Sequence, residues 1–222
     1  MQSKRLDKKA VSRFLELSTP NISDALDSLR IRGGCEGIKP VVPGLRFVGQ
    51  AYTVKYIPTA LVPGTVGDYI DDVPPGDVIV LDNEGRTDCT VWGDILTLTA
   101  VSRGIAATVV HGVCRDIGRV RDLRYPVFSK GYYMVTGKDR VEVAGINVPV
   151  SVSGIQVRPG DLLVGDESGV LVAPIERVDE ILSVATKIAE NEKHIEEEVQ
   201  KGSKLRDARQ KFRYHELQRA KT

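Results

Sequence analysis

Cysteine and histidine are scarce in this sequence of 222 residues. The three cysteines, Cys35, Cys89 and Cys114, are odd in number, widely spaced and form no CxxC pair. A disulfide framework or a zinc site usually needs paired or closely spaced cysteines, so we expect neither. Reduced thiols in a cytoplasmic protein are the simpler interpretation. The three histidines form no recognisable local motif with a cysteine or serine, and we expect none of them to be catalytic.

Long apolar segments and an excess of charge of one sign are also missing. No stretch approaches the roughly 18 uninterrupted apolar residues of a membrane span, and the first residues contain no apolar core of a secretory signal. Lys and Arg number 31 against 30 Asp and Glu, which leaves a formal net charge of +1. Only the segment from Lys201 to Thr222 is rich in Lys and Arg. We therefore expect no membrane partner and no nucleic-acid partner.

Glycine-rich nucleotide loops are absent as well. The sequence has no Walker-type loop, and no GxGxxG follows a predicted strand. This argues against binding of nucleotides or dinucleotides through those loops, and nothing supports a methyltransferase. The composition is that of an ordinary globular protein, with 41% hydrophobic and 27% charged residues. The length suits one compact domain, or one domain plus an appendage.

The middle of the chain alternates between two hydrophobic periods. Short apolar runs at 77–81, 106–110 and 127–128 predict strands, while the segments 92–103 and 117–123 have helical spacing. Strands that alternate with helices favour a parallel sheet with helices packed on it. The fold class that we expect is therefore α/β.

The two ends of the chain follow other patterns. Residues 7–17 predict a short amphipathic helix, and Thr19 before Pro20 predicts the N-cap of a second helix. Between residues 141 and 172, short β-rich pieces separated by glycines favour antiparallel hairpins. A long amphipathic helix is expected over 177–200, followed by a second helical segment.

One candidate site stands at the start of the helix predicted over 92–103. Gly93 and Asp94 open this helix, so the backbone N–H groups of Ile95 and Leu96 belong to a first turn that lacks helical acceptors. Such groups form a natural cradle for an anion such as a carboxylate. The structural alternative is that Asp94 is only an N-cap.

Arg115 and Asp116 follow the next predicted strand directly. Ligands of open α/β sheets bind at the carboxyl ends of the strands. Arginine offers a planar, permanently charged fork for a carboxylate or an enolate oxygen, and aspartate offers a hard oxygen for Mg²⁺. The structural alternative is a surface ion pair with Asp116 as another N-cap. The residues alone do not decide between the two.

The spacing of these residues resembles that of a known family. Asp94, twenty intervening residues and then Arg115-Asp116 match the D-X20-R-D signature of class II pyruvate aldolases of the 4-hydroxy-4-methyl-2-oxoglutarate type. These aldolases share a fold with the RraA proteins, regulators of ribonuclease activity. Further segments are similar to landmarks of the same family and occur in the same order: 18–26, 75–78, 103–104, 125–128, 158–161 and 166–170.

The resemblance implies a fold and an assembly. It implies a single swivelling β/β/α-type domain over residues 1–200 and a C-terminal helical tail over 201–222 that packs on a neighbouring subunit. The family assembles as homotrimers or homohexamers with sites between subunits. The resemblance also implies a divalent metal, Mg²⁺ or Mn²⁺, and a small-molecule 2-oxo acid as substrate.

The resemblance also assigns roles to the signature residues. Asp116 would hold the metal, Arg115 would contact the keto or enolate oxygen, and Asp94 would hydrogen-bond a metal-bound water. The N–H groups that follow Gly93, those of Ile95 and Leu96, would bind the substrate carboxylate.

A glutamate from the C-terminal helix of a neighbouring chain would complete the metal's outer shell. Glu192 fits that position best, Glu190 and Glu196 are alternatives, and a solvated helix face is the structural explanation for all three. His111 departs from the family pattern. The family often has an acidic residue at this position, directly before the glycine that is Gly112 here. The substrate is therefore the least determined part of the prediction.

Two functions remain open on this evidence. The first is a metal-dependent lyase that forms a pyruvate enolate from 2-oxo acids, as an aldolase, an oxaloacetate decarboxylase or both. The second is a non-enzymatic RraA-like regulator that binds a ribonuclease or a helicase. A fold alone does not decide between them.

Overall fold

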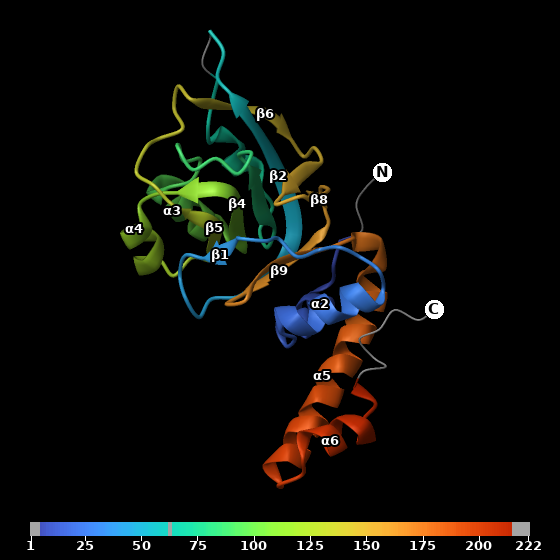
Figure 1. Ribbon diagram of the computed structural model, residues 1–222. Helices are drawn as coiled ribbons and strands as arrows, with labels where there is room; N and C mark the ends of the chain where they lie inside the picture. The colour runs from blue at the N-terminus through green and yellow to red at the C-terminus, as the bar shows by residue number, and fades with distance from the viewer. Residues whose placement is uncertain (1–4, 62–63, 215–222) are drawn as a thin grey trace.

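The computed structural model describes residues 5–61 and 64–214, which form an α/β fold with a long C-terminal helix (Figure 1). The helices are α1 (Lys8–Leu15), α2 (Thr19–Ser28), α3 (Asp94–Arg103), α4 (Ile117–Asp122), α5 (Val178–Gln200) and α6 (Leu205–Lys211), with short 3₁₀ helices η1 (Asp68–Asp72) and η2 (Ile175–Arg177). The strands are β1 (Lys39–Pro40), β2 (Phe47–Pro58), β3 (Val78–Asp82), β4 (Ala107–Cys114), β5 (Val127–Tyr132), β6 (Val141–Ile146), β7 (Val150–Val152), β8 (Ile155–Val157), β9 (Leu162–Asp166) and β10 (Gly169–Ala173).

The main sheet is mixed, with its parallel part where the sequence predicts it. Its order is β1-β5-β4-β3-β2-β9-β10, and β6 also pairs with β2. The pairs β2–β3, β3–β4 and β4–β5 are parallel. The pairs β2–β9 and β9–β10 are antiparallel, as are β7 and β8 in a separate hairpin. Both the parallel centre and the later antiparallel hairpins are confirmed.

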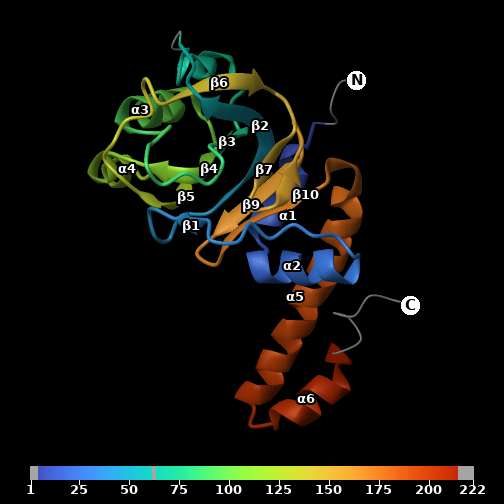
Figure 2. The same cartoon turned by 45° about the horizontal axis from the view of Figure 1, so that its top comes forward.

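Three apolar clusters hold the layers together. The first packs α3 and α4 onto one face of the parallel strands, and Trp92 stacks there on Tyr125 with ring centroids 6.1 Å apart. The second fills the space between the opposite face and the β7–β8 hairpin, where Phe47 meets Phe128 edge to face. The third joins α1, α2 and α5 to β9 and β10. Figure 2 shows α3 and α4 apart from α1, α2 and α5.

The start of α2 differs by one residue from the prediction. Ser18 is the N-cap and forms a reciprocal capping box with Asn21, while Thr19 is already helical. The reason is tertiary, because both the N–H and the hydroxyl of Thr19 donate to the Asp166 carboxylate, at 2.8 and 2.7 Å. These bonds tie α2 to the end of β9.

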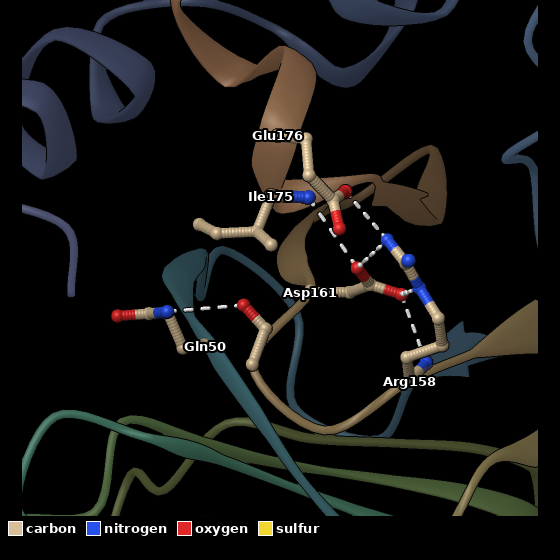
Figure 3. Close-up of polar contacts among 6 residues, drawn as sticks. Gln50, Arg158, Asp161, Ile175 and Glu176 are labelled. Carbon is tan, nitrogen blue, oxygen red and sulfur yellow. Dashed lines mark hydrogen bonds and ion pairs between the residues drawn. The ribbon is translucent and has the colours of Figure 1, made fainter. Parts of the chain in front are cut away.

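A buried carboxylate fixes the turn between β8 and β9 (Figure 3). The Asp161 side chain is only 5% exposed and accepts hydrogen bonds from the backbone N–H of Arg158 at 2.8 Å and of Ile175 at 3.3 Å. The Arg158 guanidinium donates to Asp161 at 2.9 Å and to Glu176 at 2.6 Å. Gln50 reaches the same turn from β2, through Gly160. These bonds join β2, the β8–β9 turn and η2.

The C-terminal helices project from the rest of the described chain in both views (Figures 1 and 2). The first half of α5 is anchored by buried apolar residues, among them Ile181 and Ala185. Beyond it, α6 folds back on α5, where Phe212 stacks on His194 with centroids 5.4 Å apart. The predicted tail over 201–222 thus has a helix that packs on its own chain, and its residues 215–222 lie outside the described residues. No helix among the described residues is long and apolar enough to cross a membrane.

Candidate functional site

The two halves of the D-X20-R-D spacing meet at the carboxyl end of β4. Thr90 and Val113 form a parallel bridge, and the Arg115 N–H donates to the Trp92 carbonyl at 3.0 Å. The segment that leads into α3 therefore runs beside the end of β4 like a short additional strand. This pairing brings Gly93 and Asp94 next to Arg115 and Asp116, although the rest of α3 and all of β4 lie between them in the chain.

Asp116 has a backbone conformation that is uncommon for an aspartate. Its φ of 58° and ψ of 40° are left-handed, and it precedes α4 without capping that helix through its side chain. Instead Oδ2 accepts the Asp94 N–H at 3.1 Å and lies 3.3 Å from Nε of Arg115. Asp116 thus stands at the N-cap position of α4, as the structural alternative has it, but its side chain makes no capping hydrogen bond. Its carboxylate is turned toward α3 and Arg115.

Gly93 allows this close approach. A Cβ at this position would lie 2.5 Å from Oδ2 of Asp116 and 3.2 Å from Nε of Arg115, and real Cβ atoms essentially never come closer than 3.0 Å. The backbone of Gly93 is extended (φ −159°, ψ −161°), so the requirement is for space rather than for a special conformation. Gly93 is therefore the N-cap of α3 because a larger residue would displace the acid and the arginine.

One of the free N–H groups in the first turn of α3 is hydrogen-bonded by the Asp94 side chain of the same turn. Asp94 is the first helical residue rather than the cap, and its Oδ1 accepts the Ile95 N–H at 2.8 Å. The Leu96 N–H has no hydrogen-bond partner among the residues that the structure describes. A carboxylate ligand would therefore find the Leu96 N–H available, and it would replace the Asp94 side chain at Ile95.

A cavity of about 240 Å³ opens beside these residues. Trp92, Gly93, Ile95 and Leu96 line one part and Arg115 another, and the remaining lining residues are Val66, Gly67, Thr90, Val91, Thr136 and Lys138. Its lining contains two cations and no carboxylate. An anionic small molecule suits this charge distribution.

The oxygen ligands available beside the cavity suit a hard cation that keeps most of its water ligands. No group of three or more His, Cys, Asp or Glu side chains that could hold a metal occurs within residues 5–61 and 64–214. Both contacts of the Asp116 carboxylate use Oδ2, and Oδ1 has no partner in the described part of the chain. Mg²⁺ usually keeps several waters and binds through one or two carboxylates. Among the described residues beside the cavity, Asp116 has a carboxylate oxygen available for such a cation.

Glu192 is the predicted site residue that the structure does not bring to the others. It lies on α5, where its Oε2 accepts a hydrogen bond from Asn21 Nδ2 at 2.6 Å. Both views place α5 apart from α3 and α4 (Figures 1 and 2). Within one chain, the carboxylate of Glu192 serves as a contact between α5 and α2.

His111 does not line the cavity. It lies on β4, and its Nδ1 is 3.1 Å from Oδ1 of Asp82 on β3, in a pair whose side chains are 13% and 9% exposed. Burial raises the pKa of Asp82, but hydrogen bonds from His111 and from the N–H groups of Ser151 and Glu84 outweigh it and lower this pKa overall. The histidine thus adds a side-chain contact between β4 and β3, and Ser151 of β7 donates its N–H to the same carboxylate.

Sequence reasoning missed Thr136 and Lys138 on the cavity wall. They lie between β5 and β6, in a stretch that carries no motif, and the loop is held by a parallel bridge between Thr90 and Thr136. Gly137 permits that contact, since a Cβ there would lie 2.5 Å from the Thr90 carbonyl oxygen. The glycine between these two polar residues is the one feature of the sequence that could have pointed to them as cavity residues, and it is a weak indication.

Comparison with known proteins identifies the class to which this fold and site belong. Residues 19–172 match the RraA-like family, described as Aldolase/RraA. The chain is 37% identical over 179 residues to a protein of Halalkalibacterium halodurans named "Putative 4-hydroxy-4-methyl-2-oxoglutarate aldolase", and the match covers 80% of this chain and 82% of that protein. The chain therefore belongs to the RraA-like family.

Two further similarities support this assignment. The chain is 41% identical over 210 residues to Protein DlpA of Legionella pneumophila; the match covers 93% of this chain and only 34% of DlpA. It thus spans about a third of that protein's length. The crystal structure of an uncharacterized protein from Pseudomonas syringae pv. tomato superposes with a TM-score of 0.87 at 43% identity, covering 93% of this chain and 99% of that one. The predicted RraA-like fold class is confirmed.

Proposed function

We propose that this protein is a divalent-metal-dependent lyase that acts on 2-oxo acids through a pyruvate enolate. The observation that carries the proposal is the convergence of Asp94, Arg115 and Asp116 beside one small cavity whose lining is cationic. Membership of a family described as Aldolase/RraA supports the same reaction class. The aldolase and the oxaloacetate decarboxylase reactions both pass through this enolate.

Arg115 would stabilise the oxyanion. Its Nε faces Asp116, while its terminal nitrogens have no partner among the described residues and remain available to a ligand. A preorganised charge aimed at a developing oxyanion is often the largest single contribution to catalysis. Asp116 would hold the cation with its free oxygen, and a bound divalent cation supplies Lewis-acid polarisation of a keto oxygen. The substrate carboxylate would bind at the N–H groups of Ile95 and Leu96.

Asp94 would hold a water that moves the proton. In the aldol cleavage, the C4 hydroxyl gives up its proton, the C3–C4 bond breaks, and its electron pair becomes the enolate of pyruvate. The enolate then takes a proton at C3, so the water accepts one proton and returns one. In the decarboxylation of oxaloacetate, CO₂ leaves instead and only the second transfer is needed. Asp94 is exposed at the start of α3, where solvent reaches it.

We also propose that the working form is a homotrimer or homohexamer, in which Glu192 of a neighbouring copy completes the site. The support is twofold. Within residues 5–61 and 64–214, no group of three or more His, Cys, Asp or Glu side chains could hold a metal, and α3 exposes Ile95 by 75%, Leu98 by 47% and Val101 by 41%. An exposed apolar helix face of this kind suits a protein contact. A monomer in sedimentation experiments would rule out a shared site.

The test is pyruvate release from a panel of 2-oxo acids, with oxaloacetate and 4-hydroxy-4-methyl-2-oxoglutarate included. We expect turnover with Mg²⁺ or Mn²⁺ and its loss in EDTA, restored by excess metal. Turnover that persists in EDTA would contradict the metal mechanism. Failure on the whole panel would favour the other hypothesis, a non-enzymatic regulator that binds a ribonuclease or helicase.

A further inference from the structure

Another cavity lies at the amino end of the parallel strands, at the opposite end of the sheet from Arg115. Asp77 lines it directly before β3 begins, whereas Arg115 directly follows β4, which runs parallel to β3. The cavity has a volume of about 570 Å³, and its lining residues are Arg5, Gln50, Ala51, Tyr52, Asp72, Pro74, Asp77, Asn147, Pro159 and Gly160. None of them lines the cavity of the proposed lyase site.

The buried acid of this cavity is Asp77, whose side chain is only 9% exposed. Its Oδ1 accepts a hydrogen bond from Nη1 of Arg5, and its Oδ2 has no partner among the residues that the structure describes. Burial raises the pKa of Asp77, and the interaction with Arg5 offsets only part of that rise. The carboxylate thus keeps one oxygen that a further charged donor would stabilise.

Arg5 is attached to this site by the end of its side chain. That side chain is 58% exposed, and in the described part of the chain it bonds to Asp77 alone. The next residue, Leu6, donates its backbone N–H to Oε1 of Gln50 at 2.9 Å, and this bond anchors the segment independently of Arg5. Arg5 also borders a neighbouring cavity of about 540 Å³. The guanidinium therefore has space to leave Asp77 while the segment stays anchored.

The rest of the lining suits an organic cation. Asp72 is a second acid, and Arg5 is the single basic residue among the described residues that line the cavity. Tyr52 adds a buried aromatic side chain that stacks on Tyr69, and aromatic rings attract organic cations. When Arg5 moves out into solvent, the lining therefore keeps two carboxylates and loses its positive charge.

We propose that this cavity binds a small organic cation, a guanidinium or primary ammonium compound, and that Arg5 occupies the place of its charged group at Asp77. A volume of about 570 Å³ lies within the range of small-molecule sites, roughly 300–1,000 Å³. A ligand guanidinium can donate two parallel N–H groups to both carboxylate oxygens, whereas Arg5 reaches Oδ1 alone. The exchange leaves the buried carboxylate paired throughout. The site is independent of the proposed lyase reaction.

The experiment uses two probes of the same shape and different charge, n-butylguanidinium and neutral n-butylurea. Isothermal titration calorimetry gives the affinity of wild type, Arg5→Ala, Arg5→Ala/Asp77→Asn and the control Lys9→Ala for each probe. Melting temperatures are measured with and without each probe. Lys9 is an exposed lysine of α1 that lines neither of the two cavities.

We expect wild type and Lys9→Ala to bind butylguanidinium and to bind butylurea at least about 10-fold more weakly, because a hydrogen bond to a charged group is the stronger one. Arg5→Ala should bind butylguanidinium about 10-fold more tightly than wild type, since no arginine has to be displaced. Its melting temperature should be below that of wild type and should rise with butylguanidinium alone. Asp77→Asn in the Arg5→Ala background should weaken binding by about 10- to 100-fold.

Several outcomes would overturn the inference. These are equal affinities for the two probes, binding that Asp77→Asn leaves unchanged, and no rise in the melting temperature of Arg5→Ala with butylguanidinium. Binding confined to Arg5→Ala would show an ion pair with a structural role only, and it would overturn the inference as well. Pyruvate release from the 2-oxo acid panel reports separately on the lyase proposal.

Discussion

Gly93→Ala is the substitution through which the site geometry can be examined most sharply. A methyl group at this position would lie 2.5 Å from Oδ2 of Asp116. The carboxylate must therefore retreat by about 0.5 Å or more to pass the 3.0 Å limit that real Cβ contacts respect. Nε of Arg115, at 3.2 Å from the same position, would be crowded as well. Both groups lie at the surface end of β4. We therefore expect the shift to reduce catalytic activity more than it reduces the stability of the fold.

The expected result is a loss of activity without a comparable loss of stability. A misplacement on the order of 1 Å in a catalytic constellation costs about 100-fold in rate, so we expect kcat/KM for pyruvate release to fall by about 10- to 100-fold. The matched control is Gly118→Ala on α4, two residues after Asp116, where a Cβ meets nothing within 4 Å. Alanine in a helix is favoured over glycine by about 0.5–1 kcal/mol, so this control should keep its activity and gain slightly in thermal stability.

The assay is steady-state pyruvate release at saturating Mg²⁺, with the melting temperature of each variant measured in parallel. Wild-type activity in Gly93→Ala would refute the argument that the glycine makes room for Asp116 and Arg115. An equal loss in Gly118→Ala would show that α4 tolerates no change and that Gly93 has no special place. A large drop in melting temperature for Gly93→Ala alone would assign the loss to folding instead.

Further predictions concern stability and pH. Asp161→Ala should lower the free energy of unfolding by about 2–4 kcal/mol in urea titrations, because it leaves two backbone N–H groups and the Arg158 guanidinium without a buried acceptor. The control Glu176→Ala, at an exposed residue, should lower it by under about 1 kcal/mol. Equal losses in the two variants would contradict this ranking. The pKa of Asp82 is lower in the folded state than its usual value, so its stabilising contribution is complete above an unfolded pKa of about 3.9 and is lost as pH falls through the folded pKa. Unfolding free energies measured from pH 6 to pH 3 should therefore fall less steeply in Asp82→Asn than in wild type, and parallel curves would refute this.

Much of this fold could be predicted because local and tertiary signals agree. Gly104 ends α3 in the left-handed conformation that glycine favours, and the parallel strands occur where apolar runs alternate with helical spacing. Asp94 and Arg115 could be placed together because carboxyl ends of parallel strands share one edge of a sheet. The D-X20-R-D resemblance added roles that geometry alone leaves open.

Other features depend on contacts that no local pattern encodes. The cap of α2 shifts to Ser18 because distant Asp166 binds Thr19. β4 runs past the predicted 106–110 to Cys114, since the strand continues through a register shift between Val110 and Val113. The position of Lys138 follows from the docking of its loop onto Thr90. Each of these depends on a partner far away in the chain.

The central claim is that Asp116 holds a divalent cation required for cleavage of a 2-oxo acid. The most direct measurement compares pyruvate release by wild type and Asp116→Ala over a range of Mg²⁺ concentrations, with Asp122→Ala at the end of α4 as the control acid. We predict metal-dependent release by wild type and by Asp122→Ala, and none above background for Asp116→Ala at any Mg²⁺ concentration. Release by Asp116→Ala with an unchanged Mg²⁺ dependence would contradict the account.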